Sequence, residues 1–289
     1  DCGNESKTTA TFTIEDTTDP TIDVEAQDMT VECDGEGNEA MLEAWLSSNG
    51  GAQASDLCGN VTWSNNYDGL SDDCGATGSA TVEFTATDDC GNESKTTATF
   101  TIEDTTDPML DTTAKDRVVE CDGEGNMQDF QDWIDANAEA SASDLCGDVT
   151  WSHEIVVEEE GCGATMTYEV VFTATDDCGN SASTKGIFTI EDTTDPTIDV
   201  EAQDMTVECD GEGNGAMLEE WLSNNGGAQA SDLCGDVTWS NNYDGLSDDC
   251  GATGSATVEF TATDDCGNES KTTATFTIED TTDPTIDVE

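Results

Sequence analysis

The feature that most constrains this chain is a repeat of 88 residues that runs through its whole length. The tetrapeptide Asp-Cys-Gly-Asn begins at Asp1, Asp89, Asp177 and Asp265, and the four prolines keep the same step. A unit of this size is that of one small domain. The sequence therefore predicts repeats at 19–106, 107–194 and 195–282, with the C-terminal end of a preceding repeat at 1–18 and the start of a following one at 283–289. We expect the chain to be a window on a longer polypeptide.

Four cysteines recur at matching positions in each repeat, and the thirteenth, Cys2, matches the last of the four. Repeated cysteines without nearby histidines indicate a disulfide framework and an oxidising compartment. A domain this small has a thin core, so such bridges reinforce it.

The order of the turns suggests which cysteines pair. Following the chain places Cys33 and Cys74 at one end of the domain, and Cys58 and Cys90 at the other. A strand of about eight residues, ~26 Å long, separates Cys74 from Cys90, far beyond the ~7 Å that a disulfide spans. We therefore predict pairing within each repeat: Cys33–Cys74, Cys58–Cys90, Cys121–Cys162, Cys146–Cys178, Cys209–Cys250 and Cys234–Cys266.

Apolar and polar residues alternate over several short segments of the first repeat, as in half-buried strands. These segments are 21–25, 29–33, 61–65, 81–88 and 95–103. Residues 39–48 change to helical spacing, with Asn38 as the expected N-cap and Asn49-Gly50-Gly51 as the stop. The fold expected is mainly β: tandem immunoglobulin-like antiparallel β-sandwiches, each with one short helix and stapled by disulfides.

The charge is extreme, with 67 acidic residues against six Lys and Arg and a formal net charge of −61. Such a surface repels nucleic acid and anionic membranes, so neither is an expected partner. No membrane-inserting segment is visible in the sequence. Two readings of the acidity stay open: a solvated surface suited to salty water, or carboxylates that bind divalent cations.

Cation binding has positional support where one repeat meets the next. Asp19, in the segment that links one repeat to the next, should lie beside the Ser-Asp-Leu-Cys-Gly and Thr-Asp-Asp-Cys-Gly-Asn turns. Clusters of oxygen ligands alone suit Ca²⁺. The candidate ligands are Asp19, Asp56, Asp88, Asp89 and Asn92, then Asp107, Asp144, Asp176, Asp177 and Asn180, then Asp195, Asp232, Asp264, Asp265 and Asn268.

The segments TTDPTI, TVECDG, ASDLCGDVTW and TATDDCGN resemble hyaline-repeat (HYR) domains, specifically the four-cysteine HYR-like variety. These occur in tandem arrays in secreted and cell-surface proteins of Bacteroidota, and the resemblance covers all the repeats. It implies an immunoglobulin-like sandwich, an adhesive or structural role and export by type IX secretion. The helical insert and the acidity depart from the plain hyaline repeat, so ligand specificity does not carry over.

The resemblance also bears on modification. Asp16-Thr17-Thr18 and its copies resemble the Asp-Thr-Thr acceptor of O-glycosylation in Bacteroidota. An exposed linker threonine is reachable by an external enzyme. The candidate sites are Thr17, Thr105, Thr193 and Thr281.

No catalytic arrangement recurs in the repeats, because the single histidine, His153, lies only in the middle one. We therefore predict that the chain is not an enzyme. The expected function is a structural or adhesive repeat region of a long extracellular surface protein or filament, a rod that calcium rigidifies. Its expected partners are neighbouring repeats, other copies of the filament or surface glycans.

Two alternatives remain: a glycan-binding array or the spacer region of a larger secreted enzyme. A glycan-binding array requires an exposed aromatic platform, and Trp45 and Trp63 are the candidates. Both lie in phase with other apolar residues, which favours a place in the core.

Overall fold

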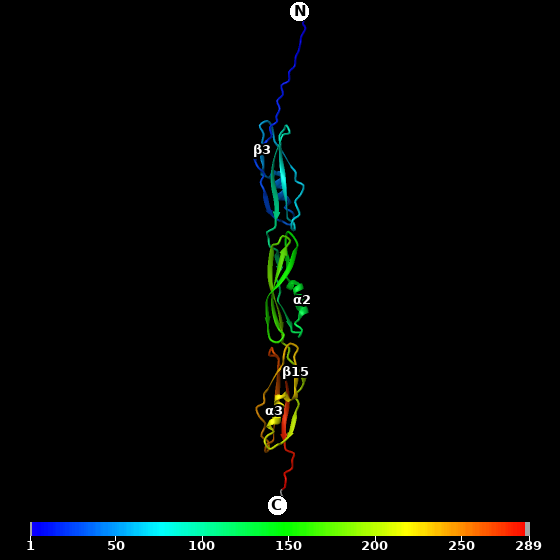
Figure 1. Ribbon diagram of the computed structural model, residues 1–289, viewed down its shortest axis with the longest axis vertical. Coiled ribbons are helices and arrows are strands. Elements are labelled where there is room, and N and C mark those ends of the chain that lie inside the picture. The colour runs from blue at the N-terminus through cyan, green and yellow to red at the C-terminus, as the bar shows by residue number, and fades with distance from the viewer. Residues whose placement is uncertain (1, 287–289) are drawn as a thin grey trace. The chain divides into compact units, whose positions relative to one another are not determined.

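The computed structural model describes residues 2–286 (Figure 1). Its three repeats share one order of elements. The first contains β1 (Thr21–Val24), β2 (Met29–Glu32), α1 (Glu39–Ser47), η1 (Asn49–Gly51), β3 (Gln53–Ser55), β4 (Thr62–Asn65), β5 (Gly78–Thr87) and β6 (Glu93–Glu103). The second contains β7 (Met109–Thr112), β8 (Arg117–Glu120), α2 (Met127–Asp135), η2 (Asn137–Glu139), β9 (Ser141–Ser143), β10 (Val149–Glu160), β11 (Met166–Asp176) and β12 (Ser181–Glu191). The third contains β13 (Thr197–Val200), β14 (Met205–Glu208), α3 (Gly215–Ser223), η3 (Asn225–Gly227), β15 (Gln229–Ser231), β16 (Thr238–Asn241), β17 (Gly254–Thr263) and β18 (Glu269–Glu279). Within residues 2–286, no helix has the length and apolar character that crossing a membrane requires.

Each repeat has a four-stranded sheet and a small two-stranded sheet. In the first repeat the strand order is β2-β6-β5-β4, and β1 pairs with β3. The long strands β5 and β6 form an antiparallel pair from Gly78 opposite Ile102 to Thr87 opposite Glu93. β2 runs parallel to β6, with Met29 opposite Phe100. The prediction of a mainly β, immunoglobulin-like sandwich is confirmed, and this parallel pair is the departure from a wholly antiparallel sheet.

The core of each sandwich forms around one tryptophan of the helix. Trp45 is 6% exposed and packs edge-on against Phe84, with ring centroids 5.2 Å apart. Its indole N–H donates to the carbonyl of Gln27 at 3.0 Å, so the buried polar atom has a partner. Trp133 and Trp221 repeat this hydrogen bond in the other repeats. The helix therefore takes the place of a strand in closing one face of the sandwich.

The predicted helix is confirmed, but Asn38, the residue before it, does not act as a usual N-cap. Asn38 has a left-handed backbone (φ 51°) and makes no side-chain capping bond to the helix. Its side-chain amide instead donates to the carbonyl of Glu32 at 2.8 Å, and its oxygen accepts from the N–H of Asp34. The Asn38 side chain thus fixes the turn between β2 and α1.

The middle repeat differs from its neighbours after the first residues of β10. In the first repeat, strand β4 ends at Asn65 and an irregular segment rich in Asn, Asp and Gly follows. In the middle repeat the corresponding stretch contains Ile155, Val156 and Val157, and the strand continues to Glu160. β-Branched residues favour the extended conformation, which accounts for the longer strand.

The chain divides by internal contacts into two compact units whose limits do not follow the repeats. One unit contains residues 2–111, 142–152 and 173–183, and the other contains 112–141, 153–172 and 184–286. The first unit therefore joins the first repeat to the two turns of the second repeat that carry Cys146 and Cys178. These turns bring the candidate site together.

Candidate functional site: the disulfide-linked junctions

Two disulfides join each repeat to the next. At the first junction Cys33 pairs with Cys146 and Cys74 pairs with Cys178, with Cα–Cα distances of 6.1 and 5.2 Å. The sequence separations are 113 and 104 residues, and the same two separations recur at the second junction, in Cys121–Cys234 and Cys162–Cys266. Each pair lies inside one compact unit. The junction is therefore a covalent structure built twice from the same parts.

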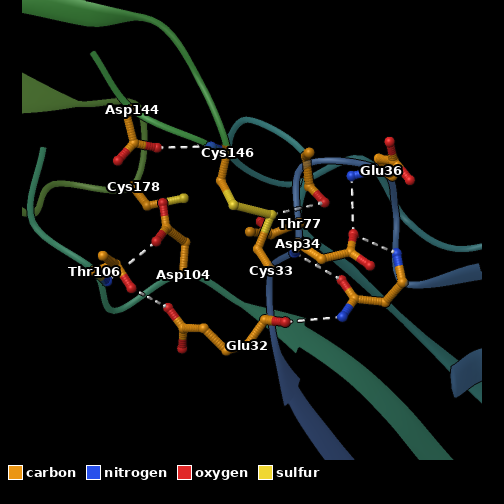
Figure 2. Close-up of a disulfide and its surroundings, with 12 residues drawn as sticks. Glu32, Cys33, Asp34, Glu36, Thr77, Asp104, Thr106, Asp144, Cys146 and Cys178 are labelled. Carbon is orange, nitrogen blue, oxygen red and sulfur yellow. Dashed lines mark hydrogen bonds between the residues drawn. A yellow bond between two sulfur atoms is a disulfide. The ribbon is translucent and has the colours of Figure 1, made fainter. Parts of the chain in front are cut away.

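Local hydrogen bonds position the two cysteines of the Cys33–Cys146 disulfide, which Figure 2 shows with its surroundings. The N–H of Cys33 donates to the carbonyl of Glu103 at 2.8 Å, which extends the pairing of β2 with β6 to the edge of the repeat. The N–H of Cys146 donates to the carboxylate of Asp144 at 2.8 Å, and its carbonyl accepts from the N–H of Ala76 at 2.6 Å. Backbone bonding across the junction thus accompanies the covalent link.

Gly75 permits this close approach. Its φ is +55°, and a Cβ at this position would collide with the carbonyl oxygen of Cys146. Gly163 meets Cys234 in the same way at the second junction, whereas Gly251, at the equivalent place in the third repeat, has no heavy atom within 4 Å of its would-be Cβ. At the two junctions, glycine therefore both adopts the left-handed backbone and leaves space for the neighbouring chain.

These disulfides correct the predicted pairing. The structure does not pair Cys33 with Cys74, Cys121 with Cys162, Cys146 with Cys178 or Cys234 with Cys266, because each of these cysteines bonds across a junction. It also leaves Cys58 and Cys90, and likewise Cys209 and Cys250, unpaired. Cys2 is unpaired as well.

The error has a geometric reason. Cys33 and Cys74 do lie at the same end of their repeat, since both contact the turns of the next repeat. The prediction paired cysteines that lie at the same end of one repeat. It did not distinguish a partner in that repeat from a partner in the neighbouring repeat, which meets the same end. An available signal was that every repeat places one pair of cysteines at each end, so two facing pairs meet wherever repeats adjoin.

Carboxylates gather beside the first disulfide of each junction. Single oxygens of Asp104 and Asp144 lie with the sulfur of Cys146 within 4.8 Å of one another, and Figure 2 shows both aspartates beside this cysteine. Burial raises the pKa of Asp104; a hydrogen bond from the N–H of Thr106 opposes this, and the charges of Asp144, Asp176 and Glu32 add to it. Asp192 and Asp232 repeat the arrangement beside Cys234. Asp16 and Asp56 form a similar cluster with Cys58, which is not part of a disulfide.

Most of the predicted calcium ligands are engaged in hydrogen bonds that hold the turns. One carboxylate oxygen of Asp176 accepts from the N–H groups of Cys178, Gly179 and Asn180, and the other accepts from the Asn180 amide. Asp88 and Asp264 hold the equivalent turns with Asn92 and Asn268. Asp89, Asp177 and Asp265 each accept from the backbone N–H of residue 60, 148 or 236. Asp107 accepts from the N–H of Ser181 at 3.2 Å.

Among the described residues, the predicted ligands Asp144, Asp56 and Asp232 each lie in a cluster with a second carboxylate. That carboxylate belongs to an aspartate that the sequence did not name as a ligand. Ca²⁺ takes six to eight oxygen ligands. The sulfur of Cys146 is part of a disulfide and is not a thiolate ligand. Two carboxylates supply a fraction of a calcium shell, so these side chains do not by themselves complete a site.

The threonines at the C-terminal end of each repeat bind the last residue of β2, β8 or β14 in the same repeat. The hydroxyl of Thr105 donates to one oxygen of Glu32 at 3.0 Å, and the hydroxyl of Thr106 donates to the other at 2.8 Å. Hydrogen bonds from the N–H of Thr105 and from the Thr106 hydroxyl lower the pKa of Glu32. Thr193 and Thr281 repeat the contact with Glu120 and Glu208. Glycosylation at Thr17, Thr105, Thr193 and Thr281 stays a prediction, and the last three are exposed residues whose hydroxyls are already bonded.

The tryptophans bear on the glycan-binding alternative. Trp45, Trp133 and Trp221 are 4–6% exposed, and Trp63 is half-buried and packs against the core of its repeat. A ring that stacks on a sugar needs an open face. The helical tryptophans are therefore core residues, as the sequence favoured.

No family model matches this chain, and no curated protein matches it. Among solved structures, it is similar to domains EC1-4 of Drosophila N-cadherin, with 10% identity over 91% of this chain and 76% of that one and a TM-score of 0.29. Domains EC22-24 of mouse cadherin-23 give 11% identity over 91% and 99%, with a TM-score of 0.28. Titin domains I67-I69, in an E-to-A mutated variant, give 8% identity over 90% and 98%, with a TM-score of 0.30. The fold assignment rests on the strand pairing described above.

Proposed function

We propose that this chain is the structural or adhesive repeat region of an extracellular surface protein or filament, in which disulfides lock each repeat to the next. The observation that carries the proposal is the recurrence of the same two inter-repeat disulfides at both junctions. Disulfides form and persist in oxidising compartments, which supports an extracellular location. A device that links domains along an array supports a structural role.

The finer features of the proposal come from the resemblance in sequence. Its motifs support membership of the four-cysteine HYR-like domains of Bacteroidota surface proteins, with export by type IX secretion. The partners that fit this role are neighbouring repeats of the same chain, other copies of the filament, and surface glycans. A catalytic role has no support in the junction, whose polar groups hold turns together.

Peptide mapping of the native protein under non-reducing conditions tests the proposal. The middle repeat carries its own sequences around Cys162 and Cys178, so their peptides differ in mass from those of the other repeats. We expect the Cys178 peptide linked to that of Cys74, and the Cys162 peptide linked to that of Cys266. Recovery of the eight bonded cysteines, such as Cys162 and Cys178, as free thiols from native material would overturn the structural, extracellular role. A link from Cys178 to Cys146 would instead overturn the locking of successive repeats.

Calcium at the junction remains part of the proposal, centred on Asp104 and Asp144. Because these carboxylates are close and partly desolvated, a divalent cation would relieve their repulsion. We expect binding in the range of about 10⁻⁴–10⁻³ M that is usual for extracellular modules. Calorimetry should show the heat of calcium binding reduced in a D104N/D144N variant and unchanged in an E43Q control, whose carboxylate lies on the exposed side of helix α1. Equal heats in both variants would contradict a site at this pair.

A further inference from the structure

The pattern of disulfides creates a second covalent route along the chain. Cys146 is bonded to the preceding repeat and Cys162 to the following one, and only 16 positions of backbone separate them. Cys178 is also bonded to the preceding repeat and lies 16 positions beyond Cys162. Two short segments therefore connect both neighbours of the middle repeat, and they converge on Cys162.

We propose that these disulfides form a covalent bypass that limits how far the array can extend under tension. A repeat of 88 residues would extend to about 300 Å if its whole backbone unravelled, at ~3.3–3.6 Å per residue. The 16-residue segment between Cys146 and Cys162 reaches only about 55 Å. The bypass becomes taut first, and the rest of the repeat then carries no load.

The bypass has little slack in the native state. Of the segment between Cys146 and Cys162, residues Val149–Glu160 already form strand β10. Twelve residues in a strand span ~40 Å, so straightening the whole segment adds about 15 Å. In a repeat linked on both sides, mechanical unfolding of the helix or of β12 therefore lengthens the array by only a small amount. This inference deepens the proposed structural role and rests on it.

Single-molecule stretching of the chain between handles on its two ends tests the bypass. To prevent disulfide exchange, the five unpaired cysteines are replaced by serine. The shortest covalent route then consists of residues 1–33, 146–162 and 266–289, joined by Cys33–Cys146 and Cys162–Cys266. We expect full extension at about 250 Å, from roughly 70 residues, and at about 1,000 Å after reduction with dithiothreitol.

Paired variants separate this route from a general effect of disulfides. Removing Cys33–Cys146 in C33S/C146S, or Cys162–Cys266 in C162S/C266S, lengthens the shortest route to about 115 residues and should raise the extension to about 390 Å. Removing Cys74–Cys178 or Cys121–Cys234 in the same way leaves the shortest route intact. These two control variants should still stop at about 250 Å.

Several results would overturn the bypass. Pairing within repeats predicts a shortest route of roughly 170 residues and an extension near 600 Å. A control variant that lengthens as much as C33S/C146S would show that the route is wrong. If peptide mapping finds the inter-repeat bonds and the oxidised chain still extends far beyond 250 Å, the bypass fails while the proposed structural role stands. Free thiols at the junction cysteines of native material would reject that role instead.

Discussion

At the scale of single residues, the junction depends on positions where a side chain would occupy the space of the next repeat. Gly75 is one of them, because its φ of +55° and its distance to the Cys146 carbonyl both exclude a Cβ. Gly251 has a similar φ of +65° but nothing within 4 Å. The two glycines therefore separate the backbone requirement from the requirement for space.

We expect G251A to cost about 1–2 kcal/mol, the usual penalty for a left-handed backbone in an L-residue. G75A carries this penalty and also pushes Cys146 away, so it should destabilise further and reduce the yield of the Cys33–Cys146 bond. Thermal unfolding and non-reducing peptide mapping of both variants measure the two effects. Equal behaviour of G75A and G251A would show that the close approach at the junction is not required.

Two aspartates of the first repeat should respond to pH with opposite signs. Burial raises the pKa of Asp104, so its charged form destabilises the fold at neutral pH, and this penalty disappears as the pH falls below ~4. The side-chain amide of Asn92 lowers the pKa of Asp88, with burial opposing it. The charge of Asp88 therefore stabilises the fold above the ordinary carboxyl range, and the benefit is lost as the pH falls through its lowered pKa.

We accordingly expect D104N to raise the denaturation midpoint at pH 7 and to approach the parent chain near pH 3. Asn at position 104 can still accept the N–H of Thr106, so the turn is kept. D88N should lower the midpoint at pH 7, because an amide cannot accept from both the Asn92 side chain and the N–H of residues 90 and 92. Urea titrations at both pH values measure this, and a D104N variant less stable than the parent at pH 7 would contradict the desolvation argument.

At the scale of elements, helix α1 buries Leu42 and Trp45 in the core of the first repeat. Trp45 contacts Phe84 and Phe100 and donates to Gln27, all within one sandwich. We expect W45A to destabilise the first repeat by about 3–5 kcal/mol. W45F keeps an aromatic ring but leaves the Gln27 carbonyl without its indole partner, and should cost less. If denaturant unfolding shows no loss for W45A, the helix is not part of the cooperative core.

The elements also show what the sequence could predict. Alternation and helical spacing located α1 and the long strands to within a few residues, because local periodicity reflects which face is buried. The short β3 was missed, since three residues carry too little pattern.

The candidate site was harder to predict than the fold, because it is formed between repeats. The cysteines, the acidic turns and the linker were all identified as components of an end or a junction. Their pairing was wrong, and Asp104 was overlooked, because both depend on which turn of the next repeat faces Cys33. Cys33 and its partner are 113 positions apart in the sequence, so no local pattern indicates their contact.

At the scale of the whole molecule, the disulfides should change how the repeats unfold together. Each closes a loop of 113 or 104 residues, for which the chain-entropy model gives roughly 4.7 kcal/mol. The loop includes parts of two repeats. When the middle repeat unfolds, the disulfides still constrain the end of the first repeat, and the first repeat loses the packing of Cys146 against its core. We therefore expect the oxidised chain to melt in one transition, or in closely overlapping ones, at a temperature well above that of the reduced and alkylated chain.

After reduction, the middle repeat, whose sequence diverges from the other two, should melt separately from them. Differential scanning calorimetry distinguishes these cases, because the ratio of calorimetric to van't Hoff enthalpy reports how many independent cooperative units the chain contains. A selective control is the C121S/C234S variant, which keeps both disulfides of the first junction. Its third repeat should be coupled less strongly than its first, since Cys162–Cys266 alone then joins it to the middle repeat. Identical coupling of the first and third repeats in this variant would mean that the disulfides add stability locally and do not unite the array.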